Sequence, residues 1–93
     1  MMRAKVRVDR VEEHFHGNRV EGPNGPVREK SSETLVFKAV AKSAAYDKDG
    51  SDEDNTYAKF SPTADFTIDC RNPALWGKFK RDDKFYVDFT PAE

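Results

Sequence analysis

Alternating side chains in the C-terminal third constrain this fold more than any other feature of the sequence. Between residues 57 and 92, apolar and polar side chains alternate, the period changes once, and the alternation then resumes. On one face of the first expected strand lie Ala64, Phe66, Ile68 and Cys70. Residues 85–89 repeat the two-residue period until a proline ends it. The pattern predicts two strands, each with one apolar face.

A short helical turn is expected between these two strands. Asn72 is a typical helix N-cap residue, and Pro73 suits the first helical position. The turn is predicted to carry Leu75, Trp76 and Phe79 toward the core.

The N-terminal part of the chain predicts three further strands. Ala4, Val6 and Val8 alternate with charged residues, and Val11 breaks that phase. A bulge or bend is therefore expected near Arg10, before the strand runs out around Phe15. A second strand is predicted over residues 34–42 and a third over residues 56–60.

Two segments rich in turn residues are predicted to be long exposed loops. Residues 17–32 contain three glycines and two prolines, and residues 43–56 end in an acidic run. Unstructured loops of more than about 12–15 residues are usually functional or disordered. We therefore expect both loops to be mobile in the free protein and to become ordered against a partner.

These elements predict one mainly β domain over residues 1–93. About five strands, with one short helix before the last strand and two long loops, suit a small antiparallel barrel or sandwich. An OB-like barrel is among the candidates, although its helix usually comes earlier in the chain. The expected core consists of Val6, Val8, Leu35, Phe37, Phe60, Phe66, Ile68, Leu75, Trp76, Phe85, Val87 and Phe89.

Composition restricts the partners and the location of the chain. Sixteen basic residues balance seventeen acidic ones, so no global field attracts nucleic acid or an anionic membrane. The single cysteine, Cys70, excludes an intrachain disulfide, suits a reducing compartment and falls in an apolar row. The sequence has neither an apolar run of membrane-spanning length nor the pattern of a signal peptide. We expect a protein that is made in a cytoplasm and has no membrane partner.

No motif in the sequence predicts an enzyme, a cofactor or a metal site. A phosphate-binding loop and a nucleophile elbow are both missing. The Asp-rich run that starts at Asp47 fails the EF-hand pattern, because its sixth and twelfth positions hold Asp52 and Ala58. His14 and His16 would share a strand face, but a stable zinc site needs three or four ligands.

Nucleic-acid binding is the alternative interpretation of the charged residues. Cations and aromatic rings, the combination that single-strand binders use, cluster at Trp76, Lys78, Lys80, Arg81, Lys84 and Tyr86. Acidic residues within the cluster cancel much of its potential. This alternative is a small OB-like single-strand-binding protein.

Three short motifs carry a resemblance. They lie at residues 57–64 (YAKFSPTA), 72–75 (NPAL) and 84–92 (KFYVDFTPA). In these motifs the chain resembles a group of small β-rich proteins of unassigned function, encoded near head genes by tailed bacteriophages and prophages. Such proteins tend to have a Pro-Gly turn before the final strand, where this chain has residues 80–83, KRDD. The resemblance implies a viral origin and transfers no catalytic residue. With a viral origin, the alternative to a structural role is a single-strand-binding or host-directed accessory protein of a phage.

A phage protein with balanced charge and two long loops suits a structural role in the virion. We expect a capsid decoration or cement protein that binds a repeated capsid protein lattice in many copies, or as a homo-oligomer, and gains strength from multivalency. The N-terminal strand is expected to add its free edge to a neighbouring sheet. The expected partner-binding residues are Arg3, Lys5, Arg7, Gly22, Pro23, Asn24, Gly25 and Pro26.

Overall fold

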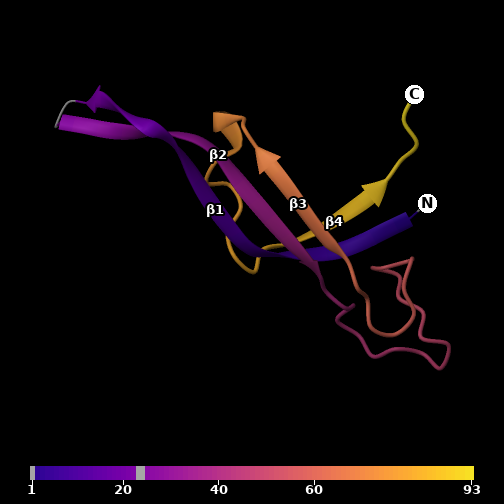
Figure 1. The fold of residues 1–93 in the computed structure, drawn as a ribbon. Helices are drawn as coiled ribbons and strands as arrows, with labels where there is room; N and C mark the ends of the chain where they lie inside the picture. The colour runs from indigo at the N-terminus through magenta and orange to yellow at the C-terminus, as the bar shows by residue number, and fades with distance from the viewer. Residues whose placement is uncertain (1, 23–24) are drawn as a thin grey trace.

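Four antiparallel strands form one sheet in the computed structural model of the protein (Figure 1). The structure describes the backbone of residues 2–22 and 25–93 and the side chains of residues 2–15 and 29–93. The strands are β1 (Met2–Gly22), β2 (Gly25–Ala39), β3 (Asp65–Cys70) and β4 (Lys84–Phe89), and their order in the sheet is β3-β2-β1-β4. The mainly β class is confirmed, but the sheet is not closed into a barrel and no second sheet of the described residues forms a sandwich with it.

Four of the five expected strands are present. The missing one was expected over residues 56–60, where Lys59 makes only an isolated bridge to Ser51. Phe60 has a left-handed backbone with φ of 62°, which ends any extended run. This segment instead belongs to a long loop, residues 40–64, between β2 and β3.

The prediction of a loop over residues 17–32 is wrong, as is the end of the first strand at Phe15. β1 and β2 pair along a long hairpin whose last paired residues are Gly22 and Gly25. Half of the N–H groups in a two-stranded ribbon point to solvent, so glycine and proline disturb it less than they would a central strand. Beyond the four-stranded part, residues 14–22 and 25–32 form a two-stranded arm. Pro23 and Asn24 lie outside the described residues.

The predicted bulge near Arg10 is confirmed. Val8 pairs with Phe37 and Val11 with Leu35, and the register shifts between Val8 and Arg10. The extra residue brings Val11 back to the core side of the sheet, where it packs against the buried cluster.

The arm makes the molecule elongated. Figure 1 shows it projecting at one end of the sheet, with the 40–64 loop at the other end. The Cα radius of gyration is 18.0 Å, and the extents are 62 × 33 × 18 Å. A compact domain of this length has a radius of gyration of about 12 Å. The chain therefore carries much more surface than a globular fold needs.

The core is a single layer on one face of the sheet. Its buried cluster consists of Ala4, Val6, Val8, Leu35, Phe37 and Cys70. Phe66, Trp76 and Val87, which were expected in the core, are half-buried against this cluster. The other five expected core residues are 38–51% exposed, because no second layer covers them: Phe60, Ile68, Leu75, Phe85 and Phe89.

A crossover segment, residues 71–83, connects the two outer strands across this face. Its short helix η1 (Pro73–Leu75) confirms the predicted turn, since the Asn72 side chain accepts a hydrogen bond of 3.1 Å from the Ala74 N–H. Across the described part of the chain, no helix has the length and apolar character needed to cross a bilayer.

Candidate protein-interaction surface

The two faces of the sheet differ sharply in chemistry. Because side chains alternate along each strand, one face receives the apolar row of every strand, and the other receives mainly charged and hydroxyl side chains, with Val36 as a buried apolar exception. The apolar face includes Val6 on β1, Phe37 on β2, Phe66 on β3 and Phe85 on β4. We call these the apolar face and the polar face.

The apolar face is hollowed between the outer strands. A hollow of about 240 Å³ is lined by Val6, Phe37, Phe66, Ile68, Phe79, Phe85 and Val87. The ring centroids of Phe66 on β3 and Phe89 on β4 lie only 6.2 Å apart, although two strands separate β3 from β4. The sheet is therefore strongly curled, and both outer strands lean toward the same hollow. Ile68 remains 51% exposed and Phe85 38% exposed at its rim.

Glu33 fixes the crossover over one end of this hollow. This carboxylate is only 2% exposed, and its oxygens accept hydrogen bonds from the Gly77 N–H at 3.2 and 3.4 Å. The Lys30 ammonium donates to Glu33 at 2.5 Å and to Glu13 at 3.1 Å. A buried carboxylate needs such partners to remain charged. Glu33 thus joins the base of the arm to a segment more than forty residues later.

Trp76 is held next to this carboxylate. Its indole N–H donates a hydrogen bond of 2.9 Å to the Cys70 carbonyl, and the Lys30 nitrogen lies 5.1 Å from the ring centroid. The hydrogen bond to Glu33, followed by the bond to Glu13, raises the pKa of Lys30 against the opposing effect of desolvation. The cation over its face and the core beneath it leave Trp76 poorly placed to stack on a free base.

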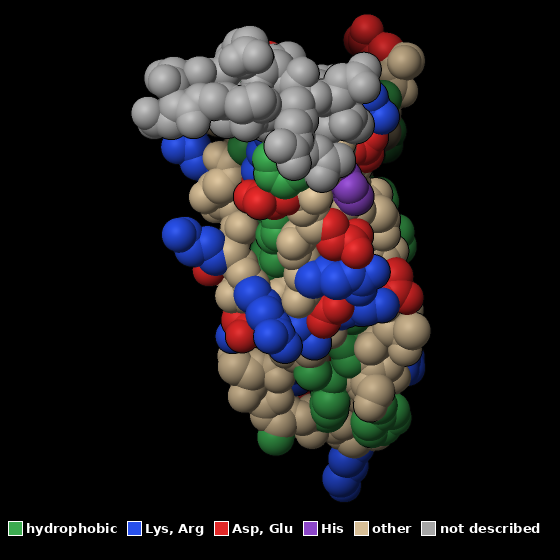
Figure 2. Space-filling view, turned by 60° about the vertical axis from the view of Figure 1, so that its left-hand side comes forward, with side chains coloured by type: hydrophobic (Ala, Val, Ile, Leu, Met, Phe, Trp, Pro, Cys, Tyr) green, Lys and Arg blue, Asp and Glu red, His purple; other side chains and the backbone are tan. Residues whose placement is uncertain are grey.

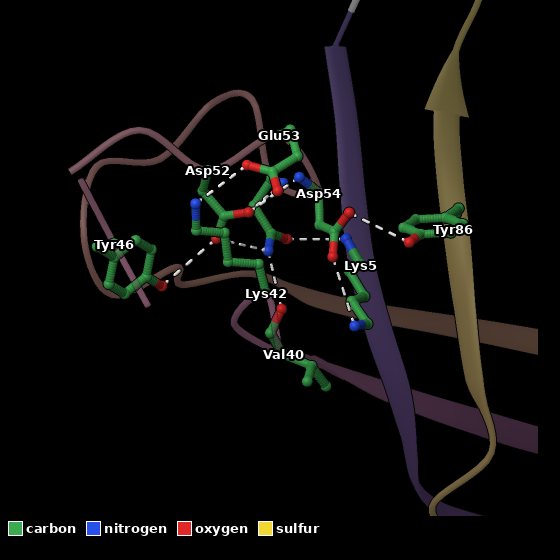
Figure 3. A network of polar contacts seen from close by, with 9 residues as sticks. Lys5, Val40, Lys42, Tyr46, Asp52, Glu53, Asp54 and Tyr86 are labelled. Atoms are coloured by element: carbon green, nitrogen blue, oxygen red, sulfur yellow. Dashed lines mark hydrogen bonds and ion pairs between the residues drawn. The ribbon is translucent and has the colours of Figure 1, made fainter. Parts of the chain in front are cut away.

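A network of hydrogen bonds joins the 40–64 loop to β1. The side-chain amide at its centre lies between Lys5, Val40 and Asp52, which are labelled in Figure 3. Asn55 is fully buried; its Oδ1 accepts from the Lys5 N–H at 2.8 Å, and its Nδ2 donates to the Val40 carbonyl at 2.8 Å. Two more hydrogen bonds join Thr56 to the main chain of Arg3: the Thr56 N–H donates to the Arg3 carbonyl at 3.0 Å, and the Arg3 N–H donates to the Thr56 hydroxyl at 2.9 Å. β2 ends at Ala39, and beyond that point the 40–64 loop takes its place along the edge of β1.

Asp52 organises the turn that presents Asn55. Its carboxylate is 3% exposed and accepts from the Asp54 N–H, the Asn55 N–H and the Asn55 side chain at 2.9, 3.0 and 3.1 Å. Burial acts to raise the pKa of Asp52, but these hydrogen bonds together outweigh it and leave the pKa below its usual value. The expected solvated acidic loop is thus only partly correct, because its central carboxylate is buried.

Ion pairs neutralise most cations of the polar face. Acidic and basic side chains interleave in the view of Figure 2. Arg3 contacts Asp88 at 2.6 Å, Lys5 contacts Asp54 at 3.4 Å, and Arg7 contacts Asp9 at 3.2 Å. Arg3 also lies 4.5 Å from the centroid of the Tyr86 ring. This face carries many charges but little net field.

The expected partner-binding residues fall in two separate places. Arg3, Lys5 and Arg7 share the polar face, as predicted, but β1 is a central strand and has no free edge there. Gly22 and Gly25 pair at the far end of the arm, and Pro26 follows them in β2. The predicted free edge is therefore absent at Arg3, Lys5 and Arg7, because β4 pairs with β1 over residues 2–7. The addition of this strand to a neighbouring sheet stays a prediction for the later part of β1.

The expected nucleic-acid cluster is split between the two faces. Trp76 packs against the core on the apolar face, whereas the Tyr86 hydroxyl donates to Asp54 on the polar face. Lys78, Lys80 and Arg81 belong to the crossover, and Lys84 begins β4. The sequence brings these residues close along the chain, but the sheet separates the two aromatic rings.

Metal-ligand side chains do not converge in the described part of the chain. No three His, Cys, Asp or Glu side chains there are placed to hold an ion together. His14 contacts the Thr34 hydroxyl at 2.8 Å, and the side chain of His16 lies outside the described set.

Glu33 and Asn55 are the polar residues that sequence reasoning missed. Neither residue belongs to a recognisable motif, and their role becomes visible only because both are buried in the structure. A weak signal exists for Glu33, which continues the apolar row of Leu35 and Phe37 at the same two-residue spacing. Comparison of the chain with protein-family models, curated proteins and solved structures finds no match.

Proposed function

We propose that the protein is a structural component of a phage particle, a decoration or cement protein that binds a repeated capsid surface. The arm carries this proposal. Its two strands extend the molecule to 62 Å, and a projecting ribbon of this kind adds reach without adding a core. Such a shape suits a protein that spans neighbouring subunits, and the resemblance to phage-encoded proteins supports the viral setting.

The charge pattern fits protein contacts better than phosphate contacts. Net charge is −1, and Arg3, Lys5 and Arg7 on the polar face already have carboxylate partners. Nucleic-acid affinity comes largely from free cations that displace counterions. A protein lattice, in contrast, needs only modest contacts at each copy, because the contacts repeat over the particle.

Particle binding with a shortened arm tests the proposal. Residues 16–29 are replaced by Asn-Gly, a two-residue turn that closes a hairpin between Phe15 and Lys30, which pair in β1 and β2. The buried cluster lies outside this segment, so the variant should fold. Particles made by the genome that encodes the chain should contain the wild-type protein and lose the short-arm variant.

Lys48→Ala provides the matched control, because Lys48 is exposed in the 40–64 loop and lies away from the arm. This variant should be retained on particles at wild-type level. Absence of the wild-type protein from purified particles, or equal occupancy by the short-arm variant, would contradict the proposal.

A further inference from the structure

The two outer strands of the sheet have complementary free edges. Among the described residues, β3 pairs only with β2, and β4 pairs only with β1. Both strands contain six residues. Free strand edges are templates for pairing with another chain unless they are blocked.

Printed hydrogen bonds show which residues face the free edge of β4. The N–H groups of Arg3 and Lys5 bond to the 40–64 loop, and the N–H of Val8 bonds to the Asp83 carbonyl. Because antiparallel strands direct successive residues to alternate sides, Ala4 and Val6 bond to β4. Their partners are Val87 and Phe85. The outward main-chain groups of β4 therefore belong to Lys84, Tyr86 and Asp88.

The same reasoning applies to β3. The Ala39 N–H bonds to the Ala64 carbonyl at 3.0 Å, so the next residues that bond to β2 are Phe66 and Ile68. The outward main-chain groups of β3 belong to Asp65, Thr67 and Asp69. Each free edge thus offers three residues whose side chains lie on the polar face.

We propose that two copies of the chain join β4 of one to β3 of the other, twice, and so close an eight-stranded antiparallel barrel. β3 runs in the direction of β1, and β4 runs opposite to it. A two-fold axis along the strands keeps these directions, so both new pairs are antiparallel. Each curled sheet then supplies half of the barrel, with the apolar face inside. Because each crossover is fixed by Glu33 over one end of the hollow, the two-fold axis puts both crossovers at the same end of the barrel. An eight-stranded barrel has an interior that side chains can fill.

Pairing the three outward residues of β4 with the three of β3 sets the register. Lys84 then lies opposite Asp69 of the second copy. Asp69 is paired with Arg71 of its own chain at 2.8 Å, whereas none of the described residues forms an ion pair with Lys84. Asp88 and Asp65 also meet, but each already has a cation, Arg3 and Lys38, at 2.6 Å. On the inner side, Phe85 meets Ile68.

The exposed area is sufficient for such an interface. The chain exposes 6838 Å², whereas a compact protein of its mass exposes about 5,500 Å². A standard interface buries about 800 Å² on each partner. Exposed apolar residues at the outer strands, Ile68, Phe85 and Phe89, are those that the barrel would cover.

The molar mass in solution tests the barrel directly. Light scattering across a dilution series should give twice the chain mass of 10.6 kDa. Thr67→Pro removes an N–H that the single chain does not use and blocks the edge, so it should give a monomer. Thr67→Val keeps the N–H and should remain a dimer. A wild-type monomer, an assembly of any other size, or a dimer that survives Thr67→Pro overturns the proposal.

Charge exchange supplies a second test that does not alter the backbone. Lys84→Glu should raise the dimer dissociation constant about tenfold, because the pair occurs twice in the barrel. Asp69→Lys should act similarly, and the double variant should restore most of the affinity. Additive losses in the double variant would overturn this register. These measurements use pure protein, so their outcome is independent of particle binding.

Discussion

A single buried carboxylate holds the arm, the sheet and the crossover together. Glu33 bonds to Lys30 within β2 and to the Gly77 N–H in the crossover. Its neighbour Glu13 also contacts Lys30 but is exposed. The two carboxylates therefore make similar ion pairs in different surroundings, and burial should decide their contributions.

Glu33→Gln should lower the free energy of unfolding by about 1–3 kcal/mol, because buried groups lose charge-assisted hydrogen bonds. Glu13→Gln, at an exposed pair, should cost about 0–1 kcal/mol. Urea denaturation of both variants measures the difference. Equal effects would show that Glu33 contributes no more than a surface pair.

Two glycines with left-handed backbones give a matched comparison of strain and space. Gly50 has φ of +73°, and an added Cβ would lie 2.5 Å from the Phe60 ring. Gly77 has φ of +75°, but nothing lies within 4 Å of its added Cβ. Gly77→Ala should cost about 1–2 kcal/mol for the backbone alone. Gly50→Ala should cost about 1–3 kcal/mol more, because the ring must also move. Thermal denaturation of the two variants checks this order.

At the scale of elements, the 40–64 loop should depend on pH through Asp52. Its pKa is lowered in the folded protein, so the stabilisation is complete above the unfolded pKa of about 3.9 and is lost as the pH falls through the folded value. The free energy of unfolding should therefore fall below about pH 4. Asp52→Asn should be less stable at pH 7 and should lose less on acidification.

Asp47→Asn, at an exposed position of the same loop, is the control and should keep the wild-type pH profile. An unchanged profile in Asp52→Asn would contradict the role of this carboxylate. Urea titrations at several pH values make the comparison.

Hydrogen exchange should separate the two segments that the sequence predicts as mobile loops. The amides of Lys5 and Asn55 have buried acceptors in the 40–64 loop network and should be protected. Arm amides lie in a two-stranded ribbon with no sheet beside it, and such ribbons have little stability of their own. They should exchange faster in free protein and slow down on particles. Equal protection of both segments would contradict this.

The sequence predicts correctly those strands in which apolar and polar residues alternate, because one of their faces is buried. It misplaces the strands whose residues are also common in loops. Alternation located β3, β4 and the start of β1, and the phase change at Val11 located the bulge. The glycines and prolines of the arm led to the wrong prediction of a loop, because a two-stranded ribbon tolerates residues that a central strand does not. The exposure of Phe85 and Phe89 was also unpredictable, because local pattern shows which face is apolar but not whether another layer covers it.

For the whole molecule, paired charges predict weak interaction with nucleic acid. Titration with a single-stranded oligonucleotide should leave Trp76 fluorescence unchanged at low salt, because Lys30 covers the ring and the core lies beneath it. A salt-sensitive quench would favour the single-strand-binding alternative over the capsid proposal. Filter binding with the same oligonucleotide provides an independent readout.

The bulge near Arg10 decides which deletions in β1 preserve the faces of the arm. Arg10 pairs with Val36 and Val11 with Leu35, so the residue at position 9 is the extra one. Loss of that residue would restore plain alternation and leave every later pair of β1 and β2 unchanged, so the arm would keep both of its faces and lose only the local kink. Loss of one residue from a regularly paired stretch of β1 would instead turn the side chains that follow to the opposite face. The bulge is thus a place where the gene can lose a codon without reversing what the arm displays.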